Sequence, residues 1–251
     1  MRRAYIGAML AGLVAMVPRC TSARGQNAGR AAIAGPATTG VAESGSATKG
    51  EPIDGIAVRI ESDVITESQV QELAAYQQLV DGKSQPRADV IRELIDQWIV
   101  RGEATAAQYP QPLPADVGRA FDGLQQQIGS ADEFKKHCDE AGISEGAVRR
   151  ILTEQIYLSR FLDFRFRPAA QIDAFQVQKY YDQEFVPKLK AKGQKVPPLY
   201  DVQAEIREVL VQRNIDALSK QWLADTRSGL TIDILPQAGA PQANVPQGAG
   251  Q

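Results

Sequence analysis

The sequence predicts a mainly α-helical fold in which short strands from the two ends of one domain pair with each other. Two observations support this fold class. Apolar residues recur at three- and four-residue spacing through most of residues 53–235. Alternating, β-branched residues occur near both ends of the same range. The composition is that of a globular protein, because 43% of the residues are hydrophobic and 23% are charged.

The first 23 residues have the pattern of a secretory signal peptide. Arg2 and Arg3 precede an apolar run over residues 4–17, which is shorter than the roughly 20 residues that span a membrane. We expect cleavage after Ala23 and an exported, periplasmic protein. An uncleaved leader would instead anchor the chain in the inner membrane. Cys20 would be the acceptor in a lipoprotein, although the residues before it do not match that signal.

The segments that flank the domain lack the side chains of a folded core. Residues 24–52 are rich in Gly, Ala, Ser, Thr and Pro, and residues 236–251 are mostly Pro, Gln, Ala and Gly. Because such segments bury too little apolar surface to offset the entropy of ordering, we expect both to be disordered. After cleavage Cys138 would be the remaining cysteine, so the apolar core would hold the fold without an intramolecular disulfide.

The first half of the domain has clear boundary signals. Residues 56–60 alternate as a strand, and residues 64–65 predict a short return strand. Thr66 and Gln69 match a capping box, which predicts a helix that runs to about Val80. A second helix is predicted over residues 87–107, where a wide apolar stripe ends at a proline-rich stretch.

The second half is predicted to be helical up to a closing strand. Helix caps and periodicity place helices at 116–128, 130–142, 144–166, 172–185 and 201–228, and a strand at 230–234. Residues 188–198 contain four lysines, Gly193 and two prolines. We interpret them as a solvated linker, with attraction to an anionic surface and hence membrane proximity as the alternative.

Several motifs follow one another in an order that resembles a known family. The strand at 54–58 comes first, then Leu-Ile-Asp within residues 90–97, a Gly turn at 141–144, and the pair Tyr180 and Tyr181. A closing helix and strand span residues 206–234. This order resembles the SurA-type periplasmic chaperones over residues 53–235. The resemblance implies a single helical chaperone domain that binds unfolded or nascent exported proteins without ATP or a cofactor.

The chain departs from that family in one respect. SurA- and PrsA-type proteins usually carry a parvulin prolyl-isomerase domain between the tyrosine pair and the closing helix. Residues 182–200 occupy that place and are too few for a domain. Parvulin sites also use paired histidines, whereas this chain has one, His137. The resemblance therefore implies a chaperone module without isomerase activity, with a prolyl isomerase as the enzyme alternative.

Other chemistry finds little support in the sequence. His137 and Cys138 are neighbours on a predicted helix, so their side chains point about 100° apart and do not converge on a metal or a reacting atom. No Gly-rich phosphate loop, HExxH or CxxC motif occurs. The 28 basic and 30 acidic residues give no excess of positive charge for nucleic acid. We predict no enzyme activity, metal, cofactor, nucleic acid or small-molecule substrate.

The aromatic end of the helix at 144–166 is the candidate site for client proteins. Tyr157, Phe161, Phe164 and Phe166 spread beyond a single helical stripe. Either this helix packs on two sides, or part of the surface lines an apolar groove for extended, unfolded chains. Exposed edges of the terminal strands could also add a client strand. We expect a holdase for envelope or outer-membrane proteins; the alternative is a dedicated assembly factor with one specific partner.

Overall fold

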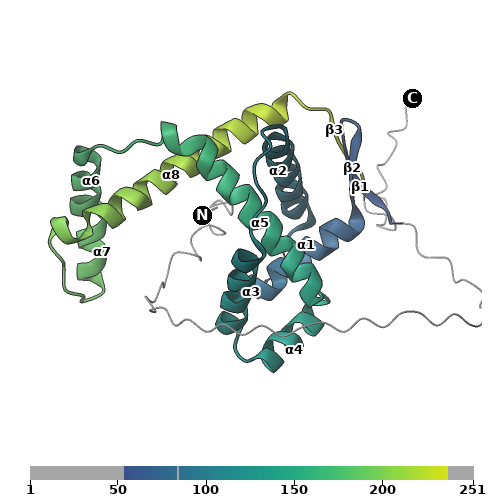
Figure 1. Cartoon of the computed structure of the whole chain (residues 1–251), viewed down its shortest axis with the longest axis horizontal. Helices are drawn as coiled ribbons and strands as arrows, with labels where there is room; N and C mark the ends of the chain where they lie inside the picture. The colour runs from purple at the N-terminus through teal and green to yellow at the C-terminus, as the bar shows by residue number, and fades with distance from the viewer. Residues whose placement is uncertain (1–53, 84, 237–251) are drawn as a thin grey trace, which may run out of the picture.

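The computed structural model describes residues 54–83 and 85–236. The expected signal peptide at 1–23 and the expected disordered segment at 24–52 lie outside the described residues, as does nearly all of the tail at 236–251. The described chain forms a helical body with a small sheet at one side and an arm that projects from the other side (Figure 1). The prediction of a mainly α-helical fold is confirmed.

The sheet joins the two ends of the described chain. Its strands are β1 (Ile56–Ile60), β2 (Asp63–Thr66) and β3 (Ile232–Ile234), in the antiparallel order β2-β1-β3. Val58 pairs with Ile65 on one side and with Ile234 on the other. Val58 and Ile60 are fully buried while Arg59 between them is exposed, as strand alternation requires. The predicted pairing of N- and C-terminal strands is therefore confirmed.

Five helices form the body and enclose the main core. They are α1 (Glu67–Asp81), α2 (Arg87–Ala106), α3 (Pro114–Ile128), α4 (Ala131–Ala141) and α5 (Glu145–Phe166). Thr66 and Ser130 each form a capping box, and Gly142 ends α4 in the left-handed conformation that glycine adopts without strain. Their largest fully buried side chains belong to α2, α4 and α5 and include Ile91, Phe134 and Val148.

The arm has a second, smaller core. A short 3₁₀ turn at Arg167–Ala169 leads from α5 to α6 (Ala174–Tyr180), a π-helical turn at Tyr181–Phe185 and α7 (Val186–Ala191). These pack on the first half of α8 (Leu199–Ser228), around Val177, Val202 and Ile206. The second half of α8 returns to the body, where Leu223 joins the main core (Figure 1).

The predicted linker at 188–198 is wrong in its first part. Residues up to Ala191 belong to α7, and only residues 192–198 form a loop. Pro187 is the second residue of α7 and directly follows the π-helical turn at Tyr181–Phe185. Val186 and Leu189 are half-buried. The four lysines in this short stretch made the spacing of Val186 and Leu189, which is typical of a helix, difficult to recognise in the sequence.

Candidate functional site

Among the exposed large apolar side chains of the described residues, four have at least 62% of their surface in solvent. They are Leu113, Phe164, Phe175 and Tyr200, with exposed fractions of 66%, 62%, 75% and 74%. Leu113 immediately precedes α3 and Phe164 lies near the end of α5, while Phe175 and Tyr200 belong to the arm. Both parts of the molecule therefore present apolar surface to solvent.

The aromatic residues of α5 have three different environments. Tyr157 and Phe161 are buried in the main core, Phe164 is exposed, and Phe166 is half-buried with its ring 5.8 Å from that of Trp222 on α8. Tyr157, Phe161 and Phe164 lie on one stripe at helical spacing. Phe164 is the point where this stripe runs beyond the main core. Packing against the main core and against Trp222 accounts for Tyr157, Phe161 and Phe166, whereas Phe164 stays exposed.

Tyr109 fixes the position of this aromatic end. Its ring centroid lies 5.6 Å from that of Phe161 and 5.4 Å from that of Phe164. Its hydroxyl donates to the backbone carbonyl of Arg160 at 3.2 Å, and the Tyr157 hydroxyl donates to the Tyr109 carbonyl at 3.4 Å. We call Tyr109 and Phe164 the aromatic pair. Sequence reasoning missed Tyr109, because the stretch around it was treated only as a helix stop.

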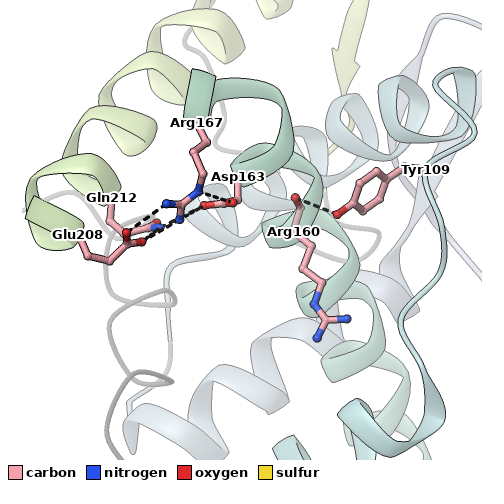
Figure 2. A network of polar contacts seen from close by, with 6 residues as sticks. All are labelled: Tyr109, Arg160, Asp163, Arg167, Glu208 and Gln212. Atoms are coloured by element: carbon pink, nitrogen blue, oxygen red, sulfur yellow. Dashed lines mark hydrogen bonds and ion pairs between the residues drawn. The ribbon is translucent and has the colours of Figure 1, made fainter. Parts of the chain in front are cut away.

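A set of polar contacts joins the end of α5 to the middle of α8 (Figure 2). Arg167 donates to both carboxylate oxygens of Asp163, at 2.7 and 2.8 Å, and to both of Glu208, at 2.7 and 3.1 Å. The Gln212 amide donates to the same two carboxylates, at 3.1 and 3.0 Å. Hydrogen bonds from Arg167 lower the pKa of Glu208 to about 2. We call these four residues the α5–α8 clamp.

The clamp lies where the arm leaves the body. Arg167 and Glu208 also line an open pocket together with Ile172, Ala204 and Val211. Paired hydrogen bonds from one guanidinium to two carboxylates fix orientation as well as distance. The clamp therefore ties the end of α5 to α8 at the place where the arm begins.

Phe175 and Tyr200 are exposed because the arm core uses the opposite faces of their helices. Phe175 lies about 200° from Val177 on α6, and Tyr200 lies about 200° from Val202 on α8. Both valines are buried in the arm core. This offset was available in the sequence, and it is the signal that could have identified both residues before the structure.

The sheet presents a free edge at β3. The backbone N–H of Leu235 donates to the Ala57 carbonyl at 2.9 Å. Because backbone groups alternate along an antiparallel ladder, those of Ile232 and Ile234 point away from β1. No other described strand pairs with β3 on that side, and the Ile234 side chain is 55% exposed. A short extended segment could bond there.

A half-buried and a buried acidic group connect α1, α2 and α8. The Gln77 amide donates to Glu93 at 2.7 Å, and Asp96 lies 3.3 Å from the Arg227 guanidinium, close enough for an ion pair but without a hydrogen bond. Desolvation by burial raises the pKa of Glu93 to about 7 and that of Asp96 to about 6. Both groups therefore titrate near neutral pH.

His137 and Cys138 face different surroundings on α4. Cys138 is buried in the core, and burial raises the pKa of its thiol. His137 is exposed, with Nδ1 3.4 Å from a carboxylate oxygen of Glu140. Within residues 54–83 and 85–236 no cluster of three metal-ligating side chains occurs. No helix in that part of the chain is long and apolar enough to cross a membrane.

Comparisons with known proteins find likeness to solved structures but no match to a family model or a curated protein. A solved chain described with two structurally related SurA-like chaperones of Campylobacter jejuni, the virulence factor PEB4 and the periplasmic protein Cj1289, is similar. The match covers 72% of this chain and 99% of that chain, with 11% identity and a TM-score of 0.44. At these values the likeness bears on neither the function nor the site residues.

Proposed function

We propose that this protein is an exported, ATP-independent chaperone that holds unfolded envelope or outer-membrane proteins, without isomerase activity. The supporting observation is the set of exposed side chains Leu113, Phe164, Phe175 and Tyr200 on both body and arm. Contacts of this kind are non-directional, so they suit clients of many sequences.

Separated weak contacts suit an unfolded client. An extended chain carries apolar segments at intervals, and two tethered contacts bind it far more tightly than either contact alone. The α5–α8 clamp sets the distance between body and arm. Binding of a client therefore does not cost the entropy of fixing that distance. Polar residues around the exposed side chains keep the free protein soluble.

The four candidate residues of α5 take different roles in this proposal. Phe164 contacts the client together with Tyr109. Tyr157 and Phe161 support the pair from the core side, and Phe166 attaches the end of α5 to Trp222 of α8. The outward backbone groups of Ile232 and Ile234 offer a second mode of contact, by strand addition.

Light scattering tests the proposal. An outer-membrane barrel protein is diluted from urea with increasing amounts of this protein, in the absence of nucleotide. We expect dose-dependent suppression of aggregation. Replacing Leu113, Phe164, Phe175 and Tyr200 by Ser should weaken suppression at least several-fold without unfolding the protein, because these side chains add little to the core.

A matched variant and a second assay make the result decisive. Val80→Ser and Val64→Ser remove exposed apolar side chains elsewhere on the body and should leave suppression unchanged. Equal aggregation with and without the wild-type protein would contradict the proposal. Copurification of one stoichiometric partner would then favour the dedicated assembly factor. Faster isomerisation of a proline peptide, lost in His137→Ala, would favour the enzyme.

A further inference from the structure

The outer end of the arm carries a concentrated positive charge. It consists of α7 and the loop at 192–198, which lie furthest from the body (Figure 1). Four exposed lysines occur here within eight residues, and no acidic residue occurs between positions 185 and 200. We call this group the lysine tip: Lys188, Lys190, Lys192 and Lys195.

The acidic residues that precede the tip have other partners. Glu184 binds both terminal nitrogens of Arg213, at 2.9 and 3.0 Å, and Asp182 accepts from the Gln178 amide at 2.8 Å. Arg213, and to a smaller extent Lys188, lower the pKa of Glu184. None of the ion pairs among residues 54–83 and 85–236 includes a lysine of the tip. Its charge therefore faces solvent.

The tip is an ordered turn that presents these charges together. The Gly193 and Gln194 amides donate to the carbonyls of Lys190 and Leu189, each at 3.0 Å. Gly193 adopts a φ of 65°, which suits glycine. The Tyr181 hydroxyl donates to the Pro197 carbonyl at 2.7 Å and fastens the far side of the loop to the arm. Four like charges held close together attract counterions or an oppositely charged surface.

We propose that the lysine tip docks this protein on an anionic phospholipid surface. A flat surface meets the end of a projecting arm without steric hindrance from the body. Lysine suits this role, since its ammonium group reaches phosphate groups while its aliphatic stem stays at the interface. Tyr200, 74% exposed just after the loop, has the polar-tipped aromatic ring that is enriched at membrane interfaces.

The docking and the client binding use different residues apart from Tyr200, which neighbours the lysine tip. None of the four lysines is assigned to clients, and the aromatic pair lies on the body. A docked arm would hold the body away from the lipid, with Phe164 still open to solvent. The proposal would survive failure of the chaperone function, and the chaperone function would survive failure of the proposal.

Vesicle flotation with the full chain tests the docking. Vesicles of phosphatidylcholine alone are compared with vesicles that contain about 30% phosphatidylglycerol, at low salt and at about 0.5 M NaCl. We expect at least tenfold stronger binding to the anionic vesicles at low salt, lost at high salt because exposed charges are screened. The comparison between vesicle types removes the contribution of the apolar residues 4–17, which act on both. Arg2 and Arg3 also favour anionic vesicles, so variants that keep both arginines are needed to isolate the lysine tip.

Two variants with the same change in net charge locate the binding. The tip variant replaces Lys188, Lys190, Lys192 and Lys195 by Gln and should bind anionic vesicles no better than neutral ones. The control replaces four lysines of the body and of α8 by Gln and should bind like wild type: Lys83, Lys135, Lys136 and Lys220. In solution without lipid, the tip variant should suppress aggregation like wild type.

Three results would overturn the proposal. One is wild-type protein that does not distinguish the two vesicle types. Another is an equal loss of binding to anionic vesicles in the tip variant and the control, because the change in net charge alone would then explain the loss. The third is binding of wild type, through the tip, to polyglutamate but not to anionic vesicles, which would assign the tip to acidic polypeptides.

Discussion

Single residues set the pH response of the fold through burial. Glu93 and Asp96 are largely removed from water, and Arg227 on α8 is the cation paired with Asp96. Burial disfavours the charged carboxylate, so the folded protein binds protons at these sites more tightly than the unfolded chain. The pKa of Glu93 is raised from 4.5 to about 7, and that of Asp96 from 3.8 to about 6.

These shifts predict greater stability at mildly acidic pH. The two charged carboxylates lower the free energy of unfolding most strongly above about pH 8. This effect is relieved as they become protonated, when the pH falls through 7 and 6. We expect the free energy of unfolding to rise by about 4 kcal/mol between pH 8 and pH 5, with the larger share from Glu93. Below about pH 4.5 the trend reverses, because Glu208 and Asp163 have lowered pKa values in the fold.

Urea denaturation at several pH values measures this effect. Glu93→Gln should be more stable than wild type at pH 8 and should show a smaller rise toward pH 5. Asp122→Asn, an exposed acid on α3, should keep the wild-type pH dependence. A wild-type stability that falls steadily from pH 8 to pH 5 would show that burial of these two groups does not govern the response.

Elements were predictable wherever local chemistry decides them. Thr66 with Gln69 and the signal at Ser130 placed two helix starts, because a cap is satisfied by residues three positions away. Burial along α5 was not predictable in the same way. Phe161 and Phe164 share one stripe, and only the position of the main core makes one of them buried and the other exposed. Partners distant in the sequence, such as Tyr109, carry no local signal.

We predict that the α5–α8 clamp sets the angle between α5 and α8. Arg167→Gln removes the charge that holds Asp163 and Glu208 together. We expect a broader distribution of distances between body and arm, with a change in unfolding free energy of less than about 1 kcal/mol, because the clamp is partly exposed.

Spin labels on exposed positions can measure that distribution. Electron-electron distance measurements between labels at Gln126 on α3 and Gln183 in the arm compare the variant with wild type. Arg119→Gln is the control, since Arg119 pairs with Asp116 away from α8. An unchanged distribution in Arg167→Gln would show that packing between α5 and α8 holds the angle without the clamp.

The whole molecule consists of two unequal cores on one long helix. Ile206 of α8 is buried in the arm core and Leu223 in the main core. The arm core contains only three buried residues, Val177, Val202 and Ile206, so it opens more easily than the body.

Ile206→Ala should therefore destabilise the arm alone. Truncation of this buried side chain lowers the free energy of unfolding of the arm by about 2–5 kcal/mol. A core with so few buried residues does not stay folded after a loss of that size. We expect faster amide hydrogen exchange in α6, α7 and the first half of α8, with exchange in α1 to α5 unchanged. Val209→Ala, on an exposed face of α8, should alter neither region. Faster exchange throughout the body would mean that arm and body unfold together.

The position of β1 between β2 and β3 has a consequence for how the protein is made. One neighbour of β1 follows it within a few residues, while the other begins at Ile232, at the opposite end of the domain. A chain that is delivered from its N-terminus can pair β1 with β2 early and pack the helices of the body. It can close the other side of the sheet only after nearly its whole length has arrived. β3, the last strand of the domain to become available, therefore completes the pairing of β1, the first.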